Sequence, residues 1–537
     1  MIEMNKLMMI PALGLAAQVG CAPKAAQSGA NKKMNILFIA VDDMKPNLGI
    51  YGDKLAVTPN MDRLGSTGYT FMNCYCQQAV SGPTRASLLT GMRPDKTRVW
   101  DLQTDFRQVN PKALSMPEYF KNNGYETVAR GKIYHVSSAG PGHDAPSWSL
   151  PYDNIEAPNY AKTNVSRGPA TEGEDVADNF FKDGKNTEDG IRLLNQLSKG
   201  DKPFFIAIGL SRPHLPFVSP KKYWDLHNRE KFQIAPFQKK AANSPDVAYH
   251  VSGELKSYTD IPQFDSYSEN ELDHLPKEKQ LELIHGYYAA TSYTDANIGR
   301  LLAELDKLGI AENTIVVLWG DHGWHLGDHG LWNKHTDFEQ ATHVVMMMRV
   351  PGMKQGLKPT TMCEFVDIFP TLCELNGLAI PSHLDGVSLV PAMKDPDAKL
   401  REYSFSQYPK ANMGYTIRTE RFRYTEWMEN DGKEKYTTAK PYDRKNCVAR
   451  EMYDYQNDPL ETKSLIGDPN YKKEQAMMED LFRQAMEREH QQCVEFTKIA
   501  DYHKKISTDE VTAKPAVTAK PAADVKPANK KGNRKRK

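Results

Sequence analysis

Three continuous apolar runs stand out along the chain, and polar residues follow each of them directly. The runs are residues 35–41 (NILFIAV), 202–210 (KPFFIAIGL) and 313–319 (NTIVVLW). Runs of this length, rich in β-branched and aromatic residues, are typical of strands buried on both faces of a sheet. Because ligands bind beyond the carboxyl ends of parallel strands, we expect the polar residues after these runs to share one site.

Helical patterns separate the apolar runs, and the pattern of hydrophobic and polar residues changes near residue 391. The clearest helix is 292–308, in which one apolar face recurs every three to four residues. Residues 415–427 alternate like an antiparallel hairpin, 452–467 continue it, and a helical stretch follows at 472–490. The sequence therefore predicts an α/β protein with a largely parallel sheet flanked by helices, and a smaller C-terminal α+β subdomain.

The two ends of the chain differ from its middle. Residues 1–21 have the shape of a secretory signal, and Val19-Gly20-Cys21 resembles a bacterial lipoprotein processing site. The alternative is an ordinary cleaved signal with an incidental cysteine. Either interpretation predicts an exported protein, in the periplasm or tethered to the outer membrane of a bacterium through a lipidated Cys21. The predicted organisation is a signal peptide (1–21), a linker (22–33), a catalytic domain (34–390), the C-terminal subdomain (391–505) and a disordered basic tail (506–537).

Composition is consistent with a globular body, and the charge is distributed unevenly. Of the 537 residues, 40% are hydrophobic and 26% charged, which excludes a mainly disordered or multi-span membrane protein. The net charge is +1, and no nucleic-acid partner is predicted. Residues 511–537 hold nine basic residues and one acid, so they carry +8 and residues 1–510 carry −7. The tail could contact an anionic polysaccharide or membrane surface, or it could simply be solvated.

The cysteines do not form a recognisable framework. Apart from Cys21 there are six, and their spacing matches no zinc pattern. One or two disulfides could form, with Cys447 and Cys493 as candidate partners. Cys363 and Cys373 are expected on one helical stretch, where they could not pair.

Acidic residues at strand ends suggest a metal site. Asp42 and Asp43 are adjacent carboxylates, whose repulsion a hard cation such as calcium or magnesium would relieve. For an isolated pair, a solvated or capping turn is the alternative, but Asp321 at the end of another strand favours the metal. The four histidines His322, His325, His329 and His335 invite a zinc interpretation, which nearby glycines disfavour because they argue against a helix.

Residues 79–91 (AVSGPTRASLLTG) place Ser81 and Arg85 at the start of a predicted helix, a position that favours an anion. A Ser-Gly-Pro turn that caps the helix would explain Ser81 but would give Arg85 no role. This segment resembles the nucleophile motif of type I sulfatases at every position. The second motif of that family appears at 124–135 (GYETVARGKIYH), with Arg130 where a small or aliphatic residue is usual.

The resemblance covers roughly residues 34–467 and, within the family, is strongest to the iduronate-2-sulfatase subgroup. It rests on VDDMKPNLGIYGDK, LSRPHLPFVSPKKYW, GDHGWHLGDHGLWNKH and ATHVVMMMRVPG. It implies an alkaline phosphatase-like fold. It also implies that Ser81 is oxidised to formylglycine by a maturation enzyme, and that Ca²⁺ is held by Asp42, Asp43, Ser81, Asp321 and His322.

The same resemblance implies a role for each remaining residue. Arg85 would steady the formylglycine hydroxyl, and Asp321 would also accept the proton of the nucleophile. Lys132 and Lys334 would bind sulfate oxygens. His135 would assist breakdown of the sulfated intermediate, and His214 would protonate the departing sugar oxygen.

The function implied is hydrolysis of a sulfate ester on a saccharide, with the 2-O-sulfate of a uronic acid in glycosaminoglycan fragments as the first candidate. The alternatives are another sulfated glycan, a phosphatase or phosphodiesterase of the same superfamily, and a sulfated-glycan binding protein that has lost catalysis. Sugar specificity is expected from loops 137–167 and 429–450. The second loop has a basic cluster that could meet a uronate carboxylate or could be solvated: Lys433, Lys435, Lys440, Arg444 and Lys445.

Overall fold

The computed structural model describes residues 33–136, 139–140, 143–429 and 440–512, and the side chains of 498–512 are not described. The predicted signal (1–21), most of the linker and residues 513–537 of the predicted tail lie outside these ranges. Among the described residues, no helix combines the length and the apolar character needed to cross a membrane.

A six-stranded sheet forms the centre of the molecule, in the order β2-β9-β8-β1-β6-β4. Four of its strands are parallel: β1 (Asn35–Val41), β6 (Phe204–Leu210), β8 (Thr314–Gly320) and β4 (Glu126–Gly131). The strand β9 (Met346–Arg349) pairs antiparallel with β8, and β2 (Tyr69–Thr70) pairs antiparallel with β9. Val41 is in register with Leu210 on one side and with Gly320 on the other. The polar residues that follow β1, β6 and β8 therefore emerge at the same edge of the sheet.

Helices cover both faces of this sheet, which explains why its strands read as continuous apolar runs. One face packs against α2 (Ser81–Thr90), α5 (Met116–Asn122) and α11 (Ile368–Leu375). The other packs against α1 (Pro59–Ser66), α6 (Lys182–Leu197) and α9 (Lys277–Lys307). Alternate residues of β1 belong to the two opposite cores. The fold is thus the predicted α/β arrangement, with a mixed, largely parallel sheet.

Helix α9 begins well before residue 292, where the apolar stripe starts. Its N-terminal half is buried around most of its circumference, including Leu283, Tyr287 and Ala289. A helix buried on all sides shows no amphipathic stripe, so the pattern identified only its second half.

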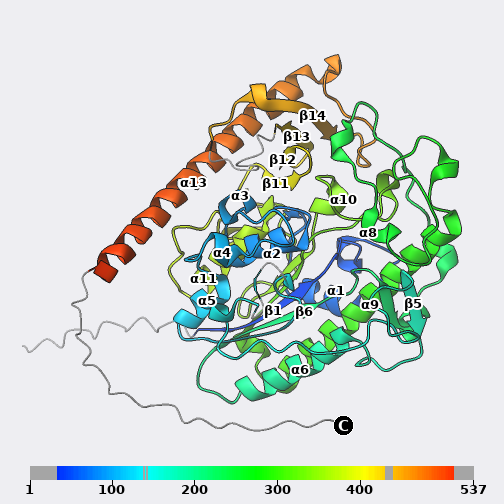
Figure 1. The fold of residues 1–537 in the computed structure, drawn as a ribbon. Coiled ribbons are helices and arrows are strands. Elements are labelled where there is room, and N and C mark those ends of the chain that lie inside the picture. The colour runs from blue at the N-terminus through cyan, green and yellow to red at the C-terminus, as the bar shows by residue number, and fades with distance from the viewer. Residues whose placement is uncertain (1–32, 137–138, 141–142, 430–439, 513–537) are drawn as a thin grey trace, which may run out of the picture.

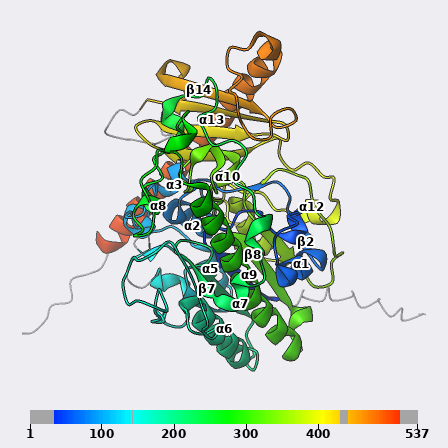
Figure 2. The same cartoon turned by 90° about the vertical axis from the view of Figure 1, so that its right-hand side faces the viewer.

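A second sheet lies above the first in Figures 1 and 2. Its strands are antiparallel in the order β11 (Ser404–Pro409), β12 (Met413–Arg418), β13 (Phe422–Met428) and β14 (Cys447–Asp454). Helix α13 (Lys472–Thr512) packs across it, with Tyr424 and Phe482 in ring contact at 5.5 Å. The helix is longer than the stretch 472–490 expected from the pattern, and it runs into the range 506–537 assigned to the tail.

Short elements connect these layers. The remaining helices are α3 (Pro94–Thr97), α4 (Phe106–Val109), α7 (Lys221–Trp224), α8 (Gly253–Lys256), α10 (Glu339–Thr342) and α12 (Val390–Lys394). The remaining strands are β3 (Cys74–Tyr75), β5 (Thr171–Glu174), β7 (Phe217–Pro220) and β10 (Cys363–Glu364).

One expectation about the cysteines is wrong. Cys363 lies in β10, which pairs with β3, whereas Cys373 lies in α11, so the two do not share a helix. None of the six cysteines of the described residues takes part in a disulfide, and the candidate bridge between Cys447 and Cys493 is not formed.

Candidate active site

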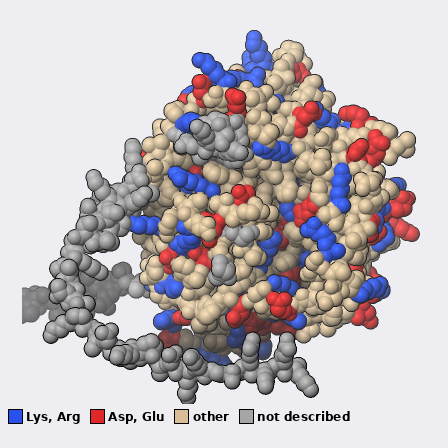
Figure 3. All heavy atoms as spheres, in the orientation of Figure 1, with Lys and Arg blue, Asp and Glu red and all other residues tan. Residues whose placement is uncertain are grey.

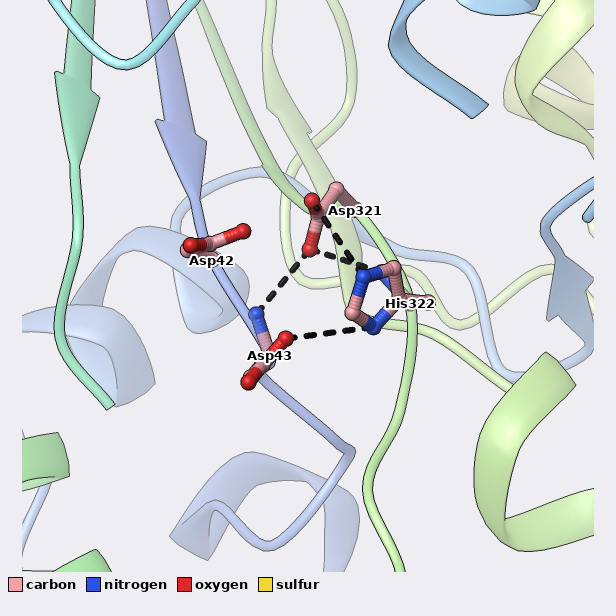
Figure 4. A group of neighbouring side chains, drawn as sticks. All are labelled: Asp42, Asp43, Asp321 and His322. Carbon is pink, nitrogen blue, oxygen red and sulfur yellow. Dashed lines mark hydrogen bonds and ion pairs between the residues drawn. The ribbon is translucent and has the colours of Figure 1, made fainter. Parts of the chain in front are cut away.

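Four metal-ligating side chains converge at the carboxyl ends of β1 and β8. Asp42 and Asp43 follow β1, Asp321 and His322 follow β8, and one potential ligand atom from each lies within 4.8 Å of all the others. Figure 4 shows these side chains turned toward one another from two neighbouring strand ends. All four are buried, with at most 1% of their surface exposed. Three buried carboxylates this close need a positive charge among them.

The donor set fits a hard divalent cation. The buried Oδ1 atom of Asp43 accepts no hydrogen bond from the described residues, and His322 Nδ1 lies 3.4 Å from it. A buried carboxylate oxygen without a hydrogen bond is costly. Burial raises the pKa of Asp43, and the cations nearby do not fully offset that effect. Burial also opposes ionisation of Asp42, but Lys132 and other cations outweigh it and hold the pKa of Asp42 well below its usual range. Oxygen ligands of this kind suit calcium or magnesium.

Ser81 lies beside this cluster at the first residue of α2. Its Oγ atom donates a hydrogen bond to Asp42 Oδ1 at 2.9 Å and lies 3.1 Å from His322 Nε2. The side chain is 3% exposed. The helix begins here because Val80 is extended, so the free N–H groups of the first turn of α2 lie next to Ser81 and favour an anion.

Arg85 connects the cluster to the second motif. Its Nε donates to Asp321 Oδ2 at 2.9 Å, and its Nη2 donates to Asp42 Oδ1 at 3.2 Å. Its Nη1 donates to the carbonyl of Ile133 at 3.1 Å, and its guanidinium lies 5.3 Å from the ring centroid of Trp319. The side chain is fully buried. Arg85 thus fixes the geometry of the carboxylates, a role that a simple capping turn would not provide.

Two lysines approach the cluster from opposite sides. Lys132, directly after β4, pairs with Asp42 through its Nζ atom. Lys334 Nζ lies 3.2 Å from Asp43 Oδ2 and 2.9 Å from Glu254 Oε2. Burial opposes the charge of Lys334, but the carboxylates around it raise its pKa. Both lysines are therefore placed to neutralise negative charge at the site.

The two histidines have opposite pKa shifts. His214 Nε2 lies 3.1 Å from Glu254 Oε1, and its Nδ1 lies 2.6 Å from the carbonyl oxygen of Leu215. Although burial opposes protonation, Asp43 and Glu254 raise the pKa of His214. Burial and the charge of Lys132 lower the pKa of His135 to about 4. At neutral pH, His135 is a proton acceptor and His214 is biased toward the donor form.

Glu254 is a site residue that the sequence did not indicate. It lies in the short helix α8, and its carboxylate bridges His214 and Lys334. Burial would raise the pKa of Glu254, but Lys334 and His214 outweigh it and hold the pKa well below its usual range. Residues 225–276 carry no periodic pattern or motif, so no local signal distinguished this acid from the others.

The other histidines of the 322–335 segment do not join the cluster. His325 Nε2 lies 2.9 Å from Thr336 Oγ1, and His329 Nε2 lies 3.1 Å from the carbonyl oxygen of Glu461. His329 has a positive φ of 57° and lies in a 3-10 turn rather than an α-helix. The glycines thus prevent the helical spacing that a zinc pair would need.

A cavity of about 390 Å³ adjoins the cluster. Asp42, Lys132, His135 and His214 line one end, and residues of the 152–167 loop line another part. Asp42 is buried and Arg167 is exposed, so the cavity leads from solvent to the carboxylates.

Comparison with known proteins assigns the chain to a family. Residues 34–378 match the sulfatase family model, and residues 327–488 match the model of the C-terminal domain of N-sulphoglucosamine sulphohydrolase. The chain therefore belongs to the sulfatase family, with its alkaline phosphatase-like fold, and is a sulfuric ester hydrolase.

Two relatives and one solved structure illustrate this similarity. The chain is 32% identical to iduronate 2-sulfatase of Homo sapiens over 538 residues, which covers 85% of this chain and 96% of that protein. It is 26% identical to Δ4,5-hexuronate-2-O-sulfatase of Bacteroides thetaiotaomicron, covering 85% and 89%. The solved structure of another protein, in complex with its substrate D-glucosamine-2-N,6-O-disulfate, superposes on this chain with a TM-score of 0.67. The two sequences are 23% identical, and the superposition covers 86% of this chain and 98% of that chain.

Proposed function

We propose that this enzyme hydrolyses a sulfate ester on a carbohydrate, and that its substrate is the 2-O-sulfate of a uronic acid in glycosaminoglycan fragments. The main observation behind the proposal is the position of Ser81, which donates a hydrogen bond to Asp42 of the buried carboxylate cluster. A cavity lined by Lys132, His135 and His214 adjoins this cluster. The two relatives named for 2-O-sulfated uronic acids support the choice of sugar.

The proposal includes a calcium ion and an oxidised Ser81. Asp42, Asp43, Asp321 and His322 would hold the ion together with residue 81. The observation that fits the ion is the Oδ1 atom of Asp43, which is buried without a hydrogen bond from the described residues. When present, the formylglycine hydrate supplies a nucleophilic hydroxyl, and its second hydroxyl provides a route for sulfate to leave. A plain serine would offer no such route.

The chain's own side chains then divide the work. Arg85 holds Asp42 and Asp321 in place around residue 81. Lys132 and Lys334 bind the sulfate oxygens. The negative charge of the sulfate would attract both lysines away from Asp42 and Asp43, with which they pair in this structure. His214, held by Glu254, donates a proton to the departing sugar oxygen. His135, neutral because burial lowers its pKa, accepts a proton at the same end of the cavity.

A phosphatase or phosphodiesterase of the same superfamily fits less well. Such an enzyme would want two metal clusters, and the part of the chain that the structure describes contains one group of suitable ligands. It would also leave Arg85 and Lys132 without their sulfatase roles.

Three measurements test the proposal. Mass spectrometry of the Ser81 peptide from the native host should show the loss of two hydrogens, and unmodified serine in active protein would overturn the formylglycine assignment. Desulfation assays on defined 2-O-, 4-O- and 6-O-sulfated saccharides should favour the 2-O-sulfated uronate. Calcium should raise the melting temperature of the full chain, and Asp43→Asn should abolish that rise without depending on turnover.

Maturation and export are two further predictions. Oxidation of Ser81 requires a maturation enzyme that acts on serine. The leader with Cys21 predicts a membrane tether, and residues 1–21 lie outside the described structure.

A further inference from the structure

The cavity that adjoins the carboxylate cluster is lined by two further cations that do not belong to that cluster. Lys182, the first residue of α6, and Arg167 both line it, together with Asn154 and Tyr258. Lys182 Nζ donates to Asn154 Oδ1 at 2.7 Å. Arg167 Nη1 donates to Ser257 Oγ at 2.6 Å, and its guanidinium lies 5.2 Å from the ring centroid of Tyr258. Neutral groups therefore orient both cations.

The acids that line the same cavity bond to groups other than Lys182 and Arg167. Asp42 pairs with Arg85 and Lys132. Asp183 accepts hydrogen bonds from the backbone N–H groups of Ser211 and Arg212 at 2.7 to 2.9 Å. Across the described ranges, neither Lys182 nor Arg167 forms an ion pair with a carboxylate, so both cations remain available to an anionic ligand in the cavity.

We propose that Lys182 and Arg167 form a subsite for a second anionic group of the substrate, distinct from the sulfate that is hydrolysed. This inference rests on the proposed function and narrows it to saccharides with at least two negative charges. The group is a carboxylate of the reacting sugar or a sulfate of its neighbour, since both accept charge-assisted hydrogen bonds from lysine and arginine.

The helix that holds Lys182 also provides a matched control. Lys185 lies one turn further along α6, and its Nζ donates to the carbonyl of Glu156 at 3.1 Å. It is not among the residues that line the cavity. A purely long-range effect of positive charge on α6 would therefore act at both positions, whereas a subsite would act only at Lys182.

The test compares Lys182→Gln, Arg167→Gln and the control Lys185→Gln in full-length protein with verified conversion of Ser81. The substrates are a uronate-2-O-sulfate disaccharide, its carboxyl-reduced analogue, the same disaccharide with an added hexosamine sulfate, and 4-nitrophenyl sulfate. We expect each subsite variant to lower kcat/KM for the disaccharide, relative to that for the aryl sulfate, by about tenfold, as for loss of one charge-assisted hydrogen bond. The control should keep the wild-type ratio.

The analogues identify the second anion. If it is the carboxylate, carboxyl reduction lowers kcat/KM of the wild type by at least the same tenfold factor, and it lowers kcat/KM of each variant by less, because one of the two contacts is already lost there. If it is a neighbouring sulfate, the added sulfate raises kcat/KM for the wild type but not for the variants. An unchanged ratio in both variants, or an equal fall in the Lys185→Gln control, would overturn the subsite.

A binding measurement separates this inference from the proposed function. In the Ser81→Ala background, calorimetry of the sulfated disaccharide reports binding without turnover. Lys182→Gln should raise the dissociation constant about tenfold, and an unchanged constant rejects the subsite. If the mature wild type hydrolyses no sulfate ester, the proposed function fails, and the calorimetry still decides the subsite.

Discussion

The carboxylate cluster and the wall of the adjoining cavity differ in how their cations are paired. At the cluster, which is the centre of the candidate site, Arg85, Lys132 and Lys334 each pair with a carboxylate, and the surrounding side chains are buried. At the wall, Lys182 and Arg167 bond to neutral partners, and neither pairs with a carboxylate of the described residues. Charges at the centre are therefore mutually dependent, because a buried charge is tolerated only when paired. Charges at the wall can change without such a penalty, so we expect the centre to fix the chemistry and the wall to select the sugar.

Bulk charge does not explain attraction of an anionic substrate. Residues 1–510 carry −7, and Figure 3 shows basic and acidic side chains interspersed over the visible face. A sulfated ligand must be held by local groups in the cavity, which makes the contrast between centre and wall testable by single substitutions.

Arg85→Met should have the largest effect, because it leaves Asp42 and Asp321 without their guanidinium. We expect the free energy of unfolding to fall by about 3 to 5 kcal/mol, as when one partner of a buried ion pair is removed. Urea denaturation measures it. Arg63→Met is the control, since Arg63 is half exposed and pairs with Asp306 at 3.5 Å. Equal stability of the two variants would contradict the dependence among the central charges.

Lys132→Ala should affect catalysis more than stability. Its side chain is 20% exposed and lines the cavity, and Asp42 keeps its contact with Arg85. We expect kcat/KM to fall about 10²- to 10³-fold, roughly 2.7 to 4 kcal/mol of barrier. Steady-state kinetics measure this fall, with Lys222→Ala as the control because Lys222 is exposed. Normal turnover of Lys132→Ala would show that Lys132 has no part in the mechanism.

Glu254→Gln should have a smaller effect, about 10- to 10²-fold on kcat, from losing charged hydrogen bonds to His214 and Lys334. The negative charge raises the pKa of His214, so its removal should move the alkaline limb of the pH profile of kcat/KM to lower pH. Glu254→Asp should restore part of both, and Glu271→Gln, an exposed acid, should change neither. A fall in rate with an unmoved alkaline limb would show that Glu254 is only structural.

Arg130→Ala should have the smallest effect and should act at the wall. Arg130 joins Asp189 of α6 to Asp153, beside Asn154 of the cavity wall. We expect KM for the disaccharide to rise about fivefold, as for a net loss of about 1 kcal/mol. Arg192→Ala is a close control, because Arg192 also pairs with Asp189 but has no contact with Asp153. The same rise in both variants would contradict a role for the Asp153 contact.

The fold could be predicted largely from local pattern. The apolar runs at 35–41, 202–210 and 313–319 correspond to β1, β6 and β8, because strands covered on both faces need apolar residues at every position. The pattern failed where burial hid periodicity, as in the first half of α9. It also failed at Cys363, where two residues of strand precede a helix.

The site was predictable only where its residues lie in short motifs. Asp42 and Asp321 directly follow strands, Ser81 begins α2, and Arg85 lies one turn further along that helix; a family resemblance linked all four. Glu254 reaches His214 and Lys334 through tertiary packing, which no spacing along the chain encodes. Lys182 reaches the cavity in the same way. The sequence left open whether the basic cluster of the 429–450 loop meets a uronate carboxylate or is solvated. Arg444 of that cluster pairs with Glu479 of α13, and Lys433 and Lys435 lie outside the described residues.

The burial of Ser81 also sets an order of events in biogenesis. Its hydroxyl contacts Asp42, which follows β1, and His322, which follows β8, and these two residues lie far apart in the sequence. A modifying enzyme could not reach a side chain that is 3% exposed once these strands have paired. If Ser81 is oxidised as proposed, the reaction must precede closure of the sheet, and a chain that folds first would remain a permanently inactive product.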